Sequence, residues 1–369
     1  MSFPPILETP EVRALLDAGS PVAIGVSGGK DSSACALATV EHLDAVGHTG
    51  PRVLIHADLG RVEWRESGPG CERLASRLGL ELLTVRRAAG DLMDRWLVRW
   101  ENNVARYAAL SCVKVILPWS TASMRFCTSE LKTEIICRAL VKRFPEQAIV
   151  SASGIRRQES SGRKNAPIAQ AQAKLTSKRH GTCGLDWHPI ADWKLDEVLA
   201  FLLAREVPLH EAYTRYGSTR VSCAFCILGS RADIAASASV PEHADLYREM
   251  VALEIASTFS FQAGWLGDVA PHLLSESTRD ALAAAKVRAI QREALEAAIP
   301  KHLLYRRGWP EVMPTHAEAK LLCGIRRQVA GLLGIEIGYV DPPALLARYA
   351  ELMREKDERD GSLASLGAA

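Results

Sequence analysis

Short apolar runs alternate with helix-like patterns in the first half of the chain. Residues 21–26, 52–57, 81–85 and 148–152 are rich in aliphatic and β-branched side chains, and they predict four buried strands. Residues 32–42 follow the first run and have the spacing of a helix. Strands that alternate with helices are typical of a parallel sheet with crossover helices. We therefore predict a doubly wound, mostly parallel α/β fold.

The second half of the chain has a different pattern, dominated by alanine-rich stretches with interspersed charges. Residues 279–298 and 343–355 have helical spacing, and 335–340 is the longest strand-like run after residue 230. We therefore predict two domains, an α/β domain over residues 1–229 and a mainly helical region over residues 230–369.

The composition is that of an ordinary globular protein. The 369 residues are 48% hydrophobic and 24% charged, with a net charge of +2. No apolar run reaches the roughly 18 residues that a membrane helix requires. The first residues also lack the basic and apolar regions of a secretory signal. We expect a cytoplasmic protein without a membrane partner.

A glycine-containing loop, Ser-Gly-Gly-Lys-Asp-Ser, follows the first predicted strand. Gly28 and Gly29 let the backbone approach an anion without Cβ atoms in the way. The unpaired N–H groups at the start of the next helix would point at phosphate oxygens. Lys30 adds a positive charge, and Ser27 and Ser32 add hydroxyl donors. The loop therefore predicts a phosphate site.

This loop is not a Walker A motif, because position 24 is Ile rather than Gly and Lys30 is followed by Asp31. It resembles instead the PP-loop of ATP pyrophosphatases. That resemblance implies binding of ATP with Mg²⁺, attack at the α-phosphate, and release of pyrophosphate from an adenylated substrate. Lys30 and Asp31 are then the catalytic candidates, and residues 27–32 bind the nucleotide.

Two further polar clusters follow predicted strands and should meet the loop at the carboxyl edge of the sheet. Asp58 could hold Mg²⁺, which prefers oxygen ligands, or could cap a turn. Arg156 and Glu159 open a basic stretch, which could bind a polyanion or form a solvated loop. Residues 165–180 within it are expected to form a mobile flap. The other basic residues are Arg157, Arg163, Lys164, Lys174, Lys178 and Arg179.

These clusters occur in the order found in the phosphoadenosine phosphosulfate reductase-like family of the PP-loop, or HUP-like, superfamily. The chain resembles this family from about residue 20 to residue 230, including residues 187–193 and 216–226. The resemblance implies that residues 1–229 bind a nucleotide, that Arg156 and Glu159 lie at its site, and that residues 187–193 are structural.

Nine cysteines in such a chain are more often buried thiols, metal ligands or catalytic groups than disulfides. Cys223 and Cys226 have the spacing of two ligands on one metal. The resemblance implies that Cys127 lies close to them, and three thiolates would hold a [4Fe–4S] cluster with one open iron. Zinc, a redox pair or a metal-free pair are the alternatives. Cys127 also begins a predicted helix, which favours a nucleophilic thiolate. Cys183 and, more weakly, Cys71 are candidates for a fourth ligand.

Two features distinguish the chain from sulfonucleotide reductases, which do not cleave ATP. Those enzymes typically lack the loop lysine and carry a catalytic cysteine in a C-terminal Glu-Cys-Gly-[Leu/Ile]-His motif. Here Lys30 is present, and Cys323 has neither the flanking Glu nor the His. Like Cys35, Cys112 and Cys137, it lies in an apolar or helix-like pattern that predicts a buried thiol.

The leading hypothesis is an ATP pyrophosphatase that adenylates an acceptor for sulfur transfer. Relatives with this activity in the superfamily include tRNA thiolases and DNA phosphorothioation enzymes. A sulfonucleotide reductase and a non-catalytic nucleotide sensor in a multi-protein system are the alternatives. Expected partners are ATP, a nucleic-acid or nucleotide acceptor, and a sulfur-donor protein such as a cysteine desulfurase.

Overall fold

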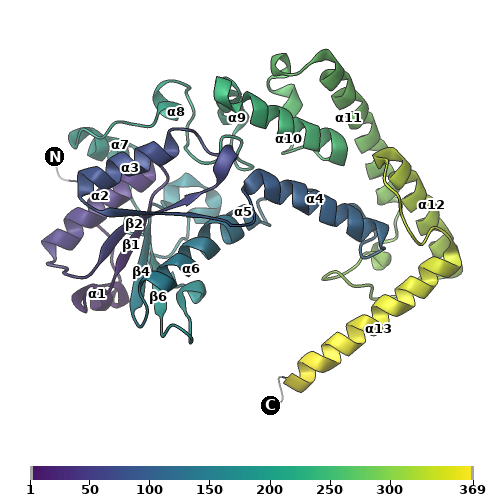
Figure 1. Cartoon of the computed structure of the whole chain (residues 1–369), viewed down its shortest axis with the longest axis horizontal. Coiled ribbons are helices and arrows are strands. Elements are labelled where there is room, and N and C mark those ends of the chain that lie inside the picture. Colours follow the sequence, from purple (N-terminus) through teal and green to yellow (C-terminus); the bar gives the residue numbers. More distant parts are fainter. Residues whose placement is uncertain (1–2, 367–369) are drawn as a thin grey trace. The chain divides into compact units, whose positions relative to one another are not determined.

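The computed structural model describes residues 3–366, with side chains described as far as residue 360. The chain divides into two compact units, and each is discontinuous in sequence (Figure 1). The first unit runs up to Leu92 and continues from Ser120 to His243, and the second contains Met93–Trp119 and the chain from Ala244 on. Within the described residues, no helix combines the length and apolar character needed to cross a bilayer.

A six-stranded sheet forms the centre of the first unit, with strand order β3-β2-β1-β4-β6-β5. All neighbouring pairs are parallel except β5 and β6, which are antiparallel. The strands are β1 (Val22–Gly25), β2 (Arg52–Asp58), β3 (Glu81–Arg86), β4 (Ala148–Ser153), β5 (Ala169–Ala171) and β6 (Cys183–Trp187). β2 and β3 lie on one side of β1, and β4 lies on its other side. The strand order therefore reverses between β1 and β4, and this position is the switch point of the sheet.

Helices cover both faces of this sheet. Successive side chains of a strand point to opposite faces, and the apolar residues of β1 on both faces are buried. Val22 and Ile24 of β1 belong to the core on the face covered by α1, α2, α3 and α7, whereas Ala23 points to the face covered by α6. The helices of this unit are α1 (Pro10–Asp17), α2 (Lys30–Ala45), α3 (Ser67–Leu78), α5 (Phe126–Thr128), α6 (Glu134–Arg143), α7 (Leu195–Ala204), α8 (Glu211–Thr214) and α9 (Arg231–Ala238).

The second unit is helical and includes one segment from the first half of the sequence. Tyr107 and Leu110, at the end of α4, are fully buried in a core with residues of α12 and α13. Arg326 of α12 is also fully buried, and its guanidinium donates to the carbonyl of Tyr107 at 2.6 Å. These contacts explain why residues 93–119 join this unit. Its helices are α4 (Leu92–Ala108), α10 (Ala244–Ser257), α11 (Glu276–Ala297), α12 (His316–Leu333) and α13 (Pro342–Leu366).

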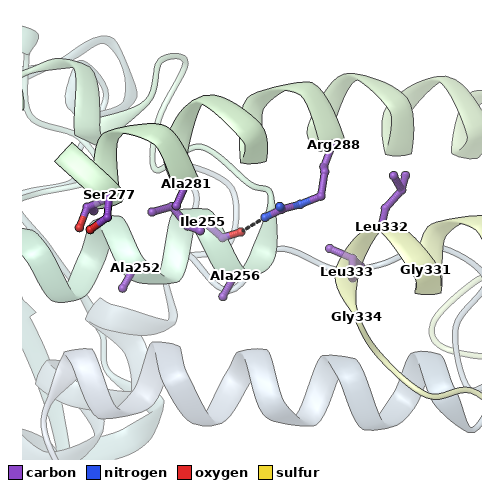
Figure 2. A pocket seen from close by; sticks show the side chains of 11 residues that line it. Ala252, Ile255, Ala256, Ser277, Ala281, Arg288, Gly331, Leu332, Leu333 and Gly334 are labelled. Carbon is purple, nitrogen blue, oxygen red and sulfur yellow. Dashed lines mark hydrogen bonds between the residues drawn. The ribbon is translucent and has the colours of Figure 1, made fainter. Parts of the chain in front are cut away.

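A cavity of about 640 Å³ opens between α10, α11 and the end of α12 (Figure 2). It is lined mainly by small and aliphatic side chains, with Arg288 as its charged residue. Arg288 donates to the carbonyl of Ile255 at 3.1 Å. The cavity belongs to the second unit, whereas the phosphate loop predicted from the sequence belongs to the first.

The predicted fold class is confirmed, and the four predicted strands correspond to β1–β4. Two local features differ from the sequence pattern. The strand-like run at residues 335–340 forms no strand, and the carbonyls of Gly338 and Tyr339 accept from Arg326 instead. Part of the expected flap is β5, an edge strand of the sheet.

The division at residues 229/230 stays a prediction. The compact units of the structure are divided differently, because α4 lies with the C-terminal helices and the first unit extends to His243. Beyond residue 230 the described chain consists of helices and loops, apart from an isolated bridge between Arg306 and Trp309, as the helical pattern predicted.

Candidate nucleotide site

The Ser27–Ser32 loop connects the end of β1 to the start of α2, at the switch point of the sheet. Gly28 has a φ of +73°, and a Cβ there would lie 3.0 Å from the backbone of Ser67, so the position requires glycine. The Ser32 hydroxyl donates to the carbonyl of Gly29 at 2.9 Å and accepts the N–H of Ser27 at 3.2 Å. The two serines therefore hold the loop in shape.

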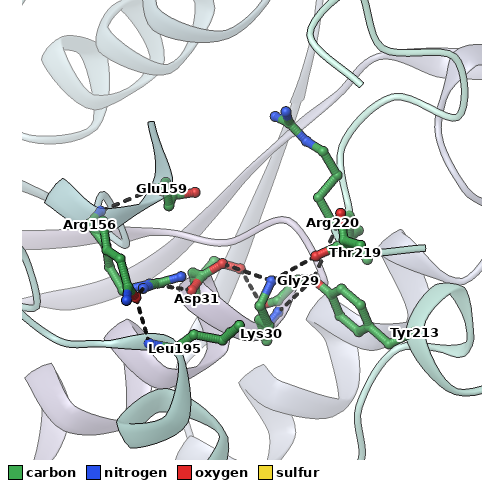
Figure 3. A network of polar contacts seen from close by, with 12 residues as sticks. Gly29, Lys30, Asp31, Arg156, Glu159, Leu195, Tyr213, Thr219 and Arg220 are labelled. Carbon is green, nitrogen blue, oxygen red and sulfur yellow. Dashed lines mark hydrogen bonds and ion pairs between the residues drawn. The ribbon is translucent and has the colours of Figure 1, made fainter. Parts of the chain in front are cut away.

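An ion-pair cluster lies directly beside the loop (Figure 3). The Arg156 guanidinium, at the end of β4, binds Asp31 at 2.6 Å, and the Lys30 ammonium lies 3.4 Å from the same carboxylate. The Arg156 side chain is only 4% exposed, and it also donates to Gln158 and to the carbonyl of Trp193. The structure thus brings together the predicted residues that follow β1 and β4.

The start of α2 also approaches the end of β4 very closely. A Cβ on Gly154 would lie 2.5 Å from the carbonyl oxygen of Asp31 and 3.0 Å from the backbone nitrogen of Ser32. No side chain fits there, because the neighbouring atoms are backbone rather than flexible side chain. Gly154 therefore allows the Asp31–Arg156 pair to form across the two strands.

Two other predicted site residues are engaged in local contacts. Glu159 accepts the N–H of Arg156 at 3.1 Å and pairs with Arg163. Asp58 accepts the N–H of Gly60 at 2.7 Å and lies 3.3 Å from Arg86, so both of its carboxylate oxygens have partners. This geometry matches the turn-capping alternative. A magnesium ion at Asp58 would have to compete with Arg86, whose side chain is 58% exposed, and that role stays a prediction.

The basic stretch after β4 is also paired within the chain. Arg157 binds Asp192, and Lys174 binds Glu134 at 2.7 Å. These contacts and the Arg163–Glu159 pair use charges that the sequence suggested for a polyanion. Binding of a polyanion by the stretch stays a prediction.

A group of residues covers the loop, and no pattern in the sequence indicates this role for them. The Tyr213 hydroxyl, from α8, accepts the N–H of Lys30 at 3.3 Å and that of Val221 at 3.2 Å. The Lys30 ammonium donates to the carbonyl of Thr219 at 3.1 Å. His210 lies against Gly28, and burial lowers its pKa to about 4. The contacts made with Gly28 and Lys30 join residues more than 180 positions apart, which no local pattern reveals.

A second cluster of titratable groups is centred on His56 of β2. Its Nδ1 donates to the carbonyl of Val26 at 3.1 Å, and its Nε2 faces Glu63 at 3.2 Å. Burial lowers the pKa of His56, but hydrogen bonds with Cys71 and Glu63 outweigh this and raise it to about 10. Cys71 is fully buried beside this histidine and is therefore placed as its partner.

The Cys-x-x-Cys pair lies next to this edge of the sheet. Cys223 forms an isolated antiparallel bridge with Glu63, and the N–H of Ala224 donates to the carbonyl of Val62 at 2.7 Å. Burial raises the pKa of the Cys223 thiol to about 12; Lys132 opposes this, and Cys226 and Cys127 add to it. Cys223 is therefore within electrostatic range of both Cys226 and Cys127. The shared metal site that the resemblance implies for the three thiols stays a prediction.

The other cysteines lie elsewhere. Cys183 is the first residue of β6 and pairs with Ala148, the first residue of β4, so it lies at the amino edge of the parallel strands, away from the phosphate loop. Cys35, Cys112, Cys137 and Cys323 are buried as predicted. Among the described residues, no three Cys, His, Asp or Glu side chains converge in a geometry that could hold a metal ion.

The sequence matches a known protein family. The family model for the phosphoadenosine phosphosulfate reductase domain matches residues 21–228. No curated protein matches the sequence. FMN adenylyltransferase from Candida glabrata is 18% identical with a TM-score of 0.36, and the match covers 56% of this chain and 55% of that one.

Two other solved structures are similarly distant. Phosphoadenylyl-sulfate reductase from Candida auris is 15% identical with a TM-score of 0.33, over 55% of this chain and 80% of that one. The U34-tRNA thiolase NcsA from Methanococcus maripaludis, described with its [4Fe–4S] cluster, is 14% identical with a TM-score of 0.37, over 79% and 76%. The family match covers more than half of the 369 residues and includes the loop, Arg156 and the Cys pair, so the chain belongs to the phosphoadenosine phosphosulfate reductase domain family.

Proposed function

We propose that the protein is an ATP pyrophosphatase that adenylates an acceptor, in the service of sulfur transfer. The observation that carries this proposal is the cluster of Lys30, Asp31 and Arg156 beside the Ser27–Ser32 loop, at the switch point of the sheet. A lysine at this place offers the full positive charge that a polyphosphate requires. A sulfonucleotide reductase acts on a sulfate that is already activated. Its reaction releases no pyrophosphate, so it does not need this positive charge to stabilise one.

The reaction would proceed by in-line displacement. A nucleophilic oxygen of the acceptor attacks the α-phosphorus of ATP, the bond from that phosphorus to the bridging oxygen breaks, and pyrophosphate leaves with the electron pair. A sulfur nucleophile then attacks the activated centre of the acceptor, and AMP leaves with the acceptor oxygen. The acceptor is a nucleic acid or a nucleotide in this proposal, and a protein such as a cysteine desulfurase supplies the sulfur.

The residues of the chain have separable roles in the first step. The amides at the start of α2 and the hydroxyls of Ser27 and Ser32 bind phosphate oxygens. Lys30 stabilises the charge that develops on pyrophosphate. Arg156 holds Asp31, and through it Lys30, in place. Mg²⁺ would accompany the ATP phosphates, and no step is assigned to it through Asp58, whose oxygens are engaged in the turn and with Arg86.

The thiols supply the link to sulfur. Cys223 has both Cys127 and Cys226 within electrostatic range, with Lys132 nearby to offset thiolate charge. Among the described residues these thiols do not converge in a geometry that could hold a metal ion. A [4Fe–4S] cluster or zinc, both of which take thiolate ligands, would be held by these three cysteines only if they moved closer together. When bound, a cluster with an open iron would carry the sulfur atom. Cys183 is not part of this set, since it lies at the other edge of the sheet.

A sulfonucleotide reductase is the second candidate, because the family takes its name from that activity. Such an enzyme requires an accessible thiol near the C-terminus. Cys323 is only 1% exposed, and burial raises its pKa, so it is a poor nucleophile. This observation favours the pyrophosphatase.

Product analysis tests the proposal. The protein is incubated anaerobically with ATP, Mg²⁺, a sulfide source and either DNA or tRNA. We expect AMP and pyrophosphate in equal amounts with one of these acceptors, and loss of both products in Lys30→Met. Thioredoxin-dependent release of sulfite from a sulfonucleotide, with ATP left intact, would establish the reductase instead.

Metal analysis of anaerobically purified protein tests the role of the thiols. We expect iron and an absorbance band near 400 nm, both lost in Cys223→Ser and retained in Cys137→Ser, whose thiol lies on the buried face of α6. Zinc in place of iron would support the same three ligands with a different metal. Colourless, metal-free protein would remove the cluster from the proposal.

A further inference from the structure

The phosphate loop is covered by a segment of its own chain. We call residues 213–221 the covering segment. Its Tyr213 hydroxyl accepts the N–H groups of Lys30 and Val221, at 3.3 and 3.2 Å, and so joins the start of α2 to the far end of the segment (Figure 3). The amide of Lys30 is one of those that a helix start offers to a phosphate oxygen. A tyrosine oxygen occupies that position here.

The covering segment also fills the space in front of the loop. A Cβ on Gly29 would lie 3.3 Å from Cβ of Val221 and 3.4 Å from the Tyr213 hydroxyl. These are contact distances, so no phosphate group fits between the loop and the segment on this side of Gly29. A polyphosphate can bind the amide of Lys30 only if the segment moves.

The charge of Lys30 is engaged by the same segment. Its ammonium donates to the carbonyl of Thr219 at 3.1 Å and lies 4.8 Å from the centre of the Tyr213 ring, and the Lys30 side chain as a whole is only 10% exposed. Both the amide and the ammonium that would bind phosphate are therefore satisfied within the chain. Burial raises the pKa of Tyr213 to about 12, so its hydroxyl is neutral and imposes no fixed charge on the site.

The covering segment is held to the fold at several points. Asp233 of α9 accepts the N–H of Thr219 at 2.7 Å and the hydroxyls of Thr219 and Ser218 at 2.9 and 3.2 Å. Val221 packs in the small core around Trp64. Gly217 lies between Tyr213 and the Asp233 anchor in sequence and has a φ of +71°, a conformation that glycine adopts at little cost. Rotation at this glycine is the backbone change by which Tyr213 would leave the loop.

We propose that the covering segment is a closed gate on the phosphate loop, and that the Tyr213 hydroxyl stands where a phosphate oxygen of ATP or pyrophosphate binds. This proposal rests on the proposed function, because it assumes that the loop binds a polyphosphate. The ligand and the tyrosine then compete for the amide of Lys30. Closure of the gate would also help to expel pyrophosphate after the reaction.

The direction in which Tyr213→Phe changes the affinity for pyrophosphate tests the gate. Tyr213→Phe removes the competing oxygen and leaves the amide of Lys30 without that partner in the closed state, so inorganic pyrophosphate should bind more tightly. We expect about a fivefold lower Kd by calorimetry, the equivalent of one net hydrogen bond of about 1 kcal/mol. Tyr216→Phe is the matched control, because the Tyr216 ring packs on Trp64; its Kd should equal that of the unaltered protein.

Hydrogen exchange gives a second readout that does not depend on affinity. Pyrophosphate should speed exchange of the Val221 amide, which loses the tyrosine oxygen, and should leave that of Lys30 protected by a phosphate oxygen. Weaker binding by Tyr213→Phe, or slower exchange at Val221, would show that Tyr213 binds the ligand directly and would overturn the gate. If the unaltered protein binds neither ATP nor pyrophosphate, the proposed function fails and the gate fails with it; unaltered binding without tightening in Tyr213→Phe removes the gate alone.

Discussion

Replacing either partner of the Asp31–Arg156 ion pair tests whether this contact holds the phosphate loop against β4. The two side chains are 125 positions apart in sequence and meet at 2.6 Å. Asp31→Asn removes one charge with little change in shape, and Arg156→Gln removes the opposite charge and shortens the side chain. Together with the double variant they form a cycle that isolates the energy of the pair.

The structure predicts unequal costs for the single variants. Asp31→Asn leaves a guanidinium that is 4% exposed beside the neutral acceptors Gln158 and Trp193, so we expect a loss of about 3–5 kcal/mol in the free energy of unfolding. Arg156→Gln leaves Asp31 facing Lys30 at 3.4 Å, so the expected loss is about 1–3 kcal/mol. The coupling energy should be about 1.5–3 kcal/mol, the value of a hydrogen bond to a charged group.

Urea denaturation of the four proteins provides the measurement. The pair Glu81–Arg143 is the control, since its side chains are 51% and 53% exposed and its coupling should stay below about 1 kcal/mol. A coupling at Asp31–Arg156 no larger than this control would refute the reasoning. So would a larger loss in Arg156→Gln than in Asp31→Asn, because Lys30 would then not compensate for the missing guanidinium.

Two further predictions concern the surroundings of the loop. Gly154→Ala should lower the free energy of unfolding by at least about 3 kcal/mol in urea and weaken ATP binding, because its Cβ would meet the backbone of Asp31 at 2.5 Å; Gly162→Ala, with no atom within 4 Å of its Cβ, should change neither. Since the folded pKa of His210 is about 4 and its ordinary value is 6.5, the unfolded chain binds more protons between these values, and stability should fall by about 3 kcal/mol as the pH drops from 6.5 to 4. His210→Asn can still cap α8 and should lack that part of the pH dependence, and an unchanged slope would contradict the assignment.

Much of the first unit could be predicted because its signals are local. The apolar runs gave β1–β4, and the loop at Ser27–Ser32 was expected at a strand–helix junction, where it lies. The meeting of Asp31 with Arg156 followed from a general rule, that residues after parallel strands share one edge of a sheet. The same rule places Cys183 at the amino edge of the sheet, opposite to the loop, but only if β6 is recognised as a strand. The sequence of β6, Cys-Gly-Leu-Asp-Trp, is short and has no clear alternation of apolar and polar residues.

The parts that could not be predicted depend on contacts between distant segments. Tyr213 is an ordinary aromatic residue in sequence, and only the fold brings its hydroxyl to Lys30. Residues 93–119 look like any other helix of the first half, yet the buried Tyr107 and the carbonyls that bind Arg326 place them with the C-terminal helices. Asp58 is a candidate metal ligand from its strand-end position, and only the fold shows that Arg86 and the turn at Gly60 engage its carboxylate oxygens.

Exchange of labelled pyrophosphate into ATP tests the central claim most directly, because it requires reversible cleavage between the α- and β-phosphates. The assay contains the protein, ATP, Mg²⁺ and an acceptor nucleic acid, with Lys142→Met as a control for loss of an exposed lysine outside the basic stretch. We predict label in ATP for the unaltered protein and for Lys142→Met, and none for Lys30→Met. Hydrolysis to ADP and orthophosphate without exchange, or exchange that persists in Lys30→Met, would contradict the assignment of this loop to cleavage at the α-phosphate.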